Sequence, residues 1–141
     1  SFMRTLSLLL ISITFLLTTA CSGGGEINGR SFKGALKSVQ RMKNRLPQQQ
    51  RIPFELSFWA IRNTYINNSE FLDLVGGKNA EEIISSGKEV FLKRKAEGFT
   101  EYQQYADWDA MIKKYTDERR EQTLKRKRDP RDKGNSVIYD L

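Results

Sequence analysis

The side chains that could do chemistry in this chain are few, and the most distinctive is a single cysteine, Cys21. The 141 residues contain no histidine, which is the most common metal ligand and general base in proteins. A lone cysteine cannot form a disulfide within the chain. We therefore expect no metal site, no catalytic residues and no cofactor, apart from whatever group the thiol itself carries.

Two short motifs suggest chemistry at first sight. Asp107 and Asp109 are two residues apart, and side chains at this spacing do not face each other on a helix. We interpret Asp107 as the start of a helix whose dipole favours a carboxylate in the first turn. Residues 76–79, GGKN, suggest a phosphate loop, but the Walker spacing is missing and no strand precedes them. They predict the end of one helix and the start of the next.

Aromatic side chains are numerous between residues 54 and 115, and most must form the core of so small a domain. Tyr and Trp are also enriched at protein interfaces, so a partner-binding surface is the alternative for Trp59, Tyr105 and Trp108. If Trp108 lies in a partner groove, Trp108→Ala should weaken binding with little effect on the melting temperature. A large loss of stability would place it in the core.

Basic residues are concentrated near the C-terminus. The whole chain carries a net charge of +7, and residues 119–133 contain eight basic and three acidic residues. The run Lys125, Arg126, Lys127 and Arg128 is typical of nucleic-acid binding. A chain exported from the cytoplasm meets anionic lipid or lipopolysaccharide phosphates instead, and these attract basic residues near a membrane. A solvated end without a partner is the alternative.

Export is what the N-terminal residues predict. We take Met3 as the natural start and the two residues before it as a cloning remnant. Arg4 is followed by an apolar run, residues 6–17, and then by small residues before Cys21, the pattern of a secretory signal. The run is shorter than the roughly 20 residues that a membrane-spanning helix needs, so a permanent transmembrane anchor is the weaker alternative.

Residues 17–21, LTTAC, resemble the lipobox of bacterial lipoproteins. The resemblance implies that a diacylglyceryl group is attached to the Cys21 sulfur and that a signal peptidase then cuts before this residue. One position departs from the family pattern, because Thr18 stands where Leu is usual. A secreted protein with a free thiol is the alternative. Acyl chains on Cys21 would hold the protein on a membrane, since two or more chains make attachment effectively permanent.

The lipobox divides the N-terminal region into two parts. Residues 1–20 are the expected signal peptide, and residues 21–30 are the expected lipidated cysteine with a flexible, Gly-rich tether. Ser22, rather than Asp, follows the cysteine. By resemblance to enterobacterial sorting, this implies a periplasm-facing lipoprotein of the outer membrane rather than of the inner membrane.

The rest of the chain predicts an all-α domain of about four to five helices over residues 31–118, followed by a basic tail over residues 119–141. Ser31 is the expected N-cap of a helix that reaches Leu46. Pro47 ends that helix, and a second helix over residues 54–66 has Pro53 in its first turn. We expect these two helices to pair as an antiparallel hairpin.

Capping residues also predict the helices of the second half. A short helix over residues 70–75 precedes the glycine pair. Asn79 and Glu82 have the spacing of a capping box, and Gly98 is the expected end of that helix. Thr100 and Gln103 predict a second capping box at the start of the next helix.

The body carries a second resemblance. Residues 27–31, INGRS, then Leu46 and Pro47 with Phe54 and Ser57, and then residues 77–84, GKNAEEII, resemble a family of small bacterial lipoproteins of unknown function. The match covers about residues 27–90, with glutamines at 48–50 where the family has acidic residues and with Asn79 in place of Thr. It implies a helical domain and an envelope location, and it implies no activity.

These observations favour a lipid-anchored, non-enzymatic binding module of the bacterial cell envelope. Its partners would be the membrane, through the lipid, and an envelope protein, without nucleic acid or metal. An immunity protein against a secreted toxin and a structural spacer of the envelope are alternatives. An enzyme that uses carboxylates is a further one, and it would require a deep pocket in which carboxylates from different helices converge.

Overall fold

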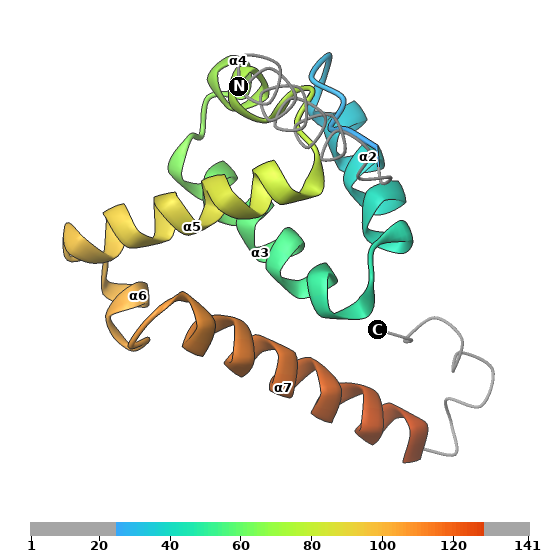
Figure 1. Ribbon diagram of the computed structural model, residues 1–141, viewed down its shortest axis with the longest axis vertical. Coiled ribbons are helices and arrows are strands. Elements are labelled where there is room, and N and C mark those ends of the chain that lie inside the picture. The colour runs from blue at the N-terminus through green and yellow to red at the C-terminus, as the bar shows by residue number, and fades with distance from the viewer. Residues whose placement is uncertain (1–24, 129–141) are drawn as a thin grey trace, which may run out of the picture.

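The computed structural model describes residues 25–128, and this part of the chain is helical with no strand (Figure 1). The predicted all-α fold class is therefore confirmed. The predicted signal peptide, Cys21 and the residues beyond 128 lie outside the described residues. Six helices follow one another within residues 25–128: α2 (Phe32–Arg45), α3 (Gln48–Thr64), α4 (Asn68–Val75), α5 (Ala80–Ala96), α6 (Thr100–Gln103) and α7 (Trp108–Arg128).

Several helix ends lie where the capping residues predict them. The Ser31 hydroxyl accepts a hydrogen bond from the Gly34 backbone N–H at 2.9 Å and begins α2. Asn79 and Glu82 form the predicted capping box at the start of α5. Gly98 follows this helix with a φ of +89°, a left-handed conformation that glycine adopts without the usual steric penalty.

Two predicted details of the helix ends are wrong. Helix α3 begins at Gln48, so Pro53 lies inside it rather than in its first turn. Burial of Ile52 stabilises this extra turn against the poor helical propensity of proline. Gln103 also forms no capping box with Thr100, because its side-chain amide donates instead to the carbonyl oxygens of Lys95 and Phe99.

Helix α3 is the centre of the fold and packs most extensively against α5. The two helices come close because α5 carries a glycine, Gly87, opposite the fully buried Ser57. Helix α2 contacts α3 less, and Figure 1 shows the two diverging from the turn that joins them. The expected hairpin is therefore open rather than closely paired along its length.

The main core lies where α2, α3, α4 and the start of α5 meet. Two of its large aromatic members, Phe58 and Phe71, pack edge to face with ring centroids 5.3 Å apart. This geometry is the preferred one for aromatic pairs and adds to the free energy gained by burying their area. The buried members of the cluster are Ile27, Ala35, Val39, Met42, Leu46, Phe54, Phe58, Ile61, Phe71, Val75, Ala80 and Ile83.

A second, smaller cluster joins the end of α5 to α6 and to the start of α7. We call it the C-terminal cluster; its buried members are Phe91, Tyr102, Tyr105, Trp108 and Met111. Phe91 stands at its centre, with ring centroids 4.8 Å from Tyr102 and 5.6 Å from Trp108. Asp107 accepts a hydrogen bond from the Ala110 N–H at 2.8 Å and starts α7, as predicted.

The packed domain begins before residue 31, and this corrects the expected tether. Ile27 is only 2% exposed and belongs to the main core. Its backbone N–H donates to the Lys78 carbonyl at 2.9 Å, and its own carbonyl accepts from the Gly77 N–H at 2.8 Å. Because apolar burial and two backbone hydrogen bonds hold this segment, residues 27–30 are part of the fold.

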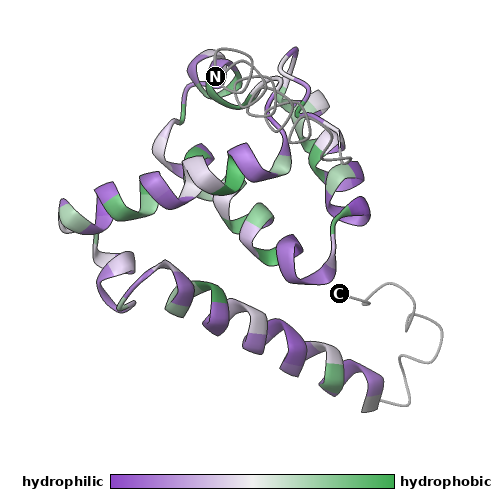
Figure 2. Ribbon diagram, viewed as in Figure 1, coloured by the Kyte–Doolittle hydropathy of each residue, from purple (hydrophilic) through white to green (hydrophobic). Residues whose placement is uncertain are grey.

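Helix α7 crosses the predicted boundary between domain and tail. It continues to Arg128, so residues 119–128 are helical rather than a separate tail. Its sequence is strongly polar, and Figure 2 shows hydrophilic residues along most of its length. Among residues 25–128 there is no helix long and apolar enough to cross a membrane.

Candidate binding groove

A groove of about 380 Å³ lies between the diverging helices α2 and α3. We call it the α2–α3 groove. Its apolar surface comes from Leu36, Val39 and Trp59, and its polar residues include two lysines and one carboxylate. The lining residues are Leu36, Lys37, Val39, Gln40, Lys43, Glu55 and Trp59.

Trp59 is the predicted partner-binding residue that lines this groove. Its side chain is 40% exposed, whereas the preceding Phe58 is fully buried. The two rings pack edge to face with centroids 5.4 Å apart, so the core orients the exposed indole. A partly exposed and oriented tryptophan beside an apolar groove is typical of the aromatic anchors that dominate protein interfaces.

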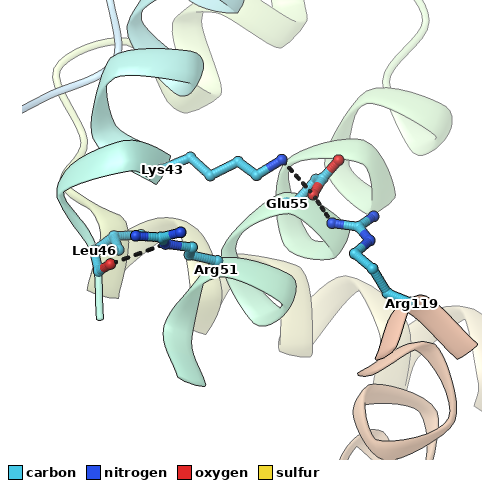
Figure 3. A network of polar contacts seen from close by, with 5 residues as sticks. All are labelled: Lys43, Leu46, Arg51, Glu55 and Arg119. Atoms are coloured by element: carbon cyan, nitrogen blue, oxygen red, sulfur yellow. Dashed lines mark hydrogen bonds and ion pairs between the residues drawn. The ribbon is translucent and has the colours of Figure 1, made fainter. Parts of the chain in front are cut away.

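A network of ion pairs stands at one end of the groove and joins three helices (Figure 3). Glu55 on α3 has one oxygen, Oε2, 3.2 Å from Lys43 Nζ on α2 and 2.7 Å from Arg119 Nη1 on α7. Partial burial by itself raises the pKa of the Glu55 carboxyl. The hydrogen bond from Arg119 and the charges of Arg119 and Lys43 outweigh burial, and the pKa lies below its ordinary value.

A hydrogen bond from the Arg51 side chain stabilises the turn between α2 and α3. Arg51 Nε donates a hydrogen bond to the Leu46 carbonyl at 3.1 Å (Figure 3). That carbonyl belongs to the C-cap residue of α2, where backbone acceptors lack helical partners. The contact helps to keep α2 and α3 in the open arrangement that leaves the groove between them.

The other two predicted partner-binding residues are not at a surface, and this prediction is wrong for them. Tyr105 is 6% exposed and Trp108 is 5% exposed, both inside the C-terminal cluster. The reason is the shortness of α6, which folds back so that α5, α6 and α7 share these rings. Trp59 therefore stands alone, without Tyr105 or Trp108, at the candidate site.

The basic run lies on the last turns of α7. Lys125, Arg126 and Lys127 have exposed side chains, and Leu124 beside them is 48% exposed. Arg128 is the last residue of the helix. The run therefore forms a helical basic end, remote in sequence from the groove but on the same helix as Arg119.

The residues that line the groove do not bring two carboxylates together. Glu55 is the one carboxylate that lines the groove, and two cations hold it ionised. Asp107 is used as a cap, with Asp109 in the first turn of α7. Among residues 25–128 there is no group of three or more Cys, His, Asp or Glu side chains placed to hold a metal ion.

Sequence reasoning missed most of the groove. Leu36, Val39 and Lys43 share one face of α2 at spacings of three and four, a signal that was readable. The ion pair of Glu55 with Arg119 joins residues 64 apart, and no local pattern predicts it. The groove itself depends on how far α2 and α3 diverge, which follows from tertiary packing.

Comparisons with known proteins add no family to this description. A scan against protein-family models gives no match, and searches of curated proteins and of solved structures give none either.

Proposed function

We propose that this protein is a lipid-anchored, non-enzymatic binding module of the bacterial cell envelope. In this proposal, a diacylglyceryl group on Cys21 holds it on the periplasmic side of a membrane, with the outer membrane favoured over the inner. The α2–α3 groove binds a partner segment that carries apolar and acidic side chains. The exposed indole of Trp59 in the groove is the observation that supports this most.

The position at which the chain enters the fold supports a binding site near the membrane. Gly25 lies beside Met42 on α2, the helix that forms one side of the groove. Only three residues separate Gly25 from Cys21, and the four Cα–Cα steps between them span at most about 14 Å. A lipid on Cys21 would therefore keep α2 close to the membrane surface, where partners at the membrane are within reach.

The chemistry of the groove favours the stated partner. Leu36, Val39 and Trp59 offer apolar surface, and Lys37 and Lys43 outnumber Glu55. Opposite charge guides association and determines which partners are accepted, whereas the buried apolar contacts supply most of the affinity. Because both cations near Glu55 keep it ionised, this carboxyl is poorly suited to act as an acid, which also supports a binding role.

Site-specific photocrosslinking in cells tests the proposal. A photoreactive residue at Gln40, exposed in the groove, should give an adduct whose partner peptide is apolar and acidic when mapped by mass spectrometry. The same residue at Lys33, exposed on α2 but outside the groove, is the matched control. Trp59→Ala and Lys37→Glu should each remove the adduct.

Three results would contradict the proposal. An adduct at position 40 that survives Trp59→Ala, or one that forms equally from position 33, would contradict the groove as the binding site. An adduct with a basic partner segment would contradict the stated partner chemistry.

A further inference from the structure

We propose that the α2–α3 groove also binds the chain's own residues 137–141, so that this segment competes with the partner. The inference rests on the groove of the proposed function, but it does not depend on the lipid anchor. Three observations carry it: the composition of the segment, its charge relative to the groove, and the length of chain available to reach the groove.

The composition of the segment differs from that of the residues before it. Residues 129–136, DPRDKGNS, have no apolar side chain except Pro130. Residues 137–141, VIYDL, contain four apolar or aromatic side chains around one carboxylate, Asp140. This is the apolar and acidic combination that suits the groove, where Leu36 and Trp59 are partly exposed above the buried Val39 and two lysines are present.

Lys37 gives Asp140 a matching charge. Lys37 is exposed at the groove, whereas Lys43 is already 3.2 Å from Glu55. A carboxylate entering the groove would therefore pair best with Lys37. Opposite charges across a docking surface favour one register over others, because the reverse placement brings like charges together.

The chain is long enough to return to the groove. Arg119 contacts Glu55 at the groove, and α7 continues from there for nine residues, about 14 Å at a rise of 1.5 Å per residue. Eight residues separate Arg128 from Val137, and the nine Cα–Cα steps between these two residues span about 30 Å when the chain is extended. The extended chain after Arg128 is longer than the part of α7 that follows Arg119. Residues 137–141 can therefore return to lie beside α2 and α3.

Quenching of Trp59 fluorescence by acrylamide measures the occupancy of the groove. The chain has two tryptophans, so Trp108→Phe leaves Trp59 as the fluorophore. In detergent, the full chain should show a quenching constant about half that of a chain ending at Ser136, because the docked segment excludes water from the indole. A peptide of residues 136–141 added to the shortened chain should restore protection.

Exchanging the charges of Lys37 and Asp140 tests whether this ion pair holds the segment in the groove. Lys37→Asp and Asp140→Lys should each raise quenching to the level of the shortened chain, and the two together should lower it again. Equal quenching in the full and shortened chains would overturn the proposal. Protection that appears only at high protein concentration would also overturn it, because the occupant would then be the segment of a second copy.

The photocrosslinker at Gln40 separates this inference from the proposed function. If residues 137–141 occupy the groove, removing them should increase the adduct with the partner. A partner adduct that is unchanged by this removal, together with unchanged quenching, overturns the inference and leaves the proposed function standing. Protection of Trp59 from quenching without any partner adduct would support the docking of residues 137–141 and would contradict the proposed binding of a partner in the groove.

Discussion

Glu55 is the residue at which α2, α3 and α7 are joined by charge. Its carboxylate contacts Lys43 and Arg119, and its pKa lies below the ordinary value of 4.5. A carboxyl whose pKa is lowered by folding stabilises the native state above its unfolded-state pKa. That contribution is lost as the pH falls through the lower folded-state pKa. The docking of α7 should therefore weaken in acid.

We expect Glu55→Gln to lower the free energy of unfolding at pH 7 by roughly 1.5 kcal/mol, because two cations lose a charged acceptor. Below pH 4.5 the difference between wild type and variant should shrink, which urea unfolding at several pH values measures. Asp117→Asn is the matched control, since its pair with Lys113 on α7 is exposed to solvent. A difference that stays constant from pH 7 to acid would contradict the assigned role.

Replacing each tryptophan by alanine should lower the free energy of unfolding by different amounts. Trp108 is 5% exposed inside the C-terminal cluster, so Trp108→Ala should cost about 3–5 kcal/mol of stability. Trp59→Ala should cost about 1 kcal/mol and should act mainly on binding. Chemical denaturation of both variants measures the stabilities. Similar losses for the two residues would show that Trp59 is a core residue rather than a binding residue.

At the scale of elements, the most extensive helix contact is that of α3 with α5. A Cβ placed on Gly87 would lie 2.5 Å from the Ser57 Cα and would overlap the Ser57 side chain. Backbone atoms cannot move aside as the end of a flexible side chain can. The glycine therefore allows the contact around which the largest helix interface forms.

Gly87→Ala should lower stability by about 1–3 kcal/mol, although alanine has the higher helical propensity. Ser85→Ala, at an exposed position of the same helix, should be neutral or slightly stabilising and serves as the control. Thermal unfolding of the two variants gives the comparison. A Gly87→Ala protein as stable as wild type would mean that α3 and α5 pack further apart than described.

The sequence predicted the ends of the helices better than it predicted how the helices pack against one another. Ser31, Asn79 and Gly98 act through neighbours within a few residues, so their roles were readable from the sequence. Ile27 joins the core through partners some fifty residues away, at Gly77 and Lys78, and was misassigned to a tether.

The difference between local and tertiary signals also explains which residues of the candidate site could be predicted from the sequence. Trp59 was found by residue type, whereas the burial of Trp108 depends on how α5, α6 and α7 meet.

At the scale of the whole molecule, we propose that the basic end of α7 makes a second contact with an anionic membrane, beside the proposed lipid anchor. Replacing Lys125, Arg126, Lys127 and Arg128 by Ala should reduce binding to vesicles that contain anionic lipid, at about 1 kcal/mol per basic residue near the surface. Cosedimentation with vesicles at low and high salt measures this. Binding that is insensitive both to the substitutions and to salt would contradict an electrostatic contact.

The central claim is that the domain works from a membrane to which Cys21 attaches it. Metabolic labelling with a palmitate analogue, followed by mass spectrometry of the mature protein, tests this most directly. We expect label on the wild-type chain, none on Cys21→Ala, and a mature chain that begins at the modified cysteine. A mature protein recovered from the cytosol with residues 3–20 still attached and an unmodified thiol would contradict the account.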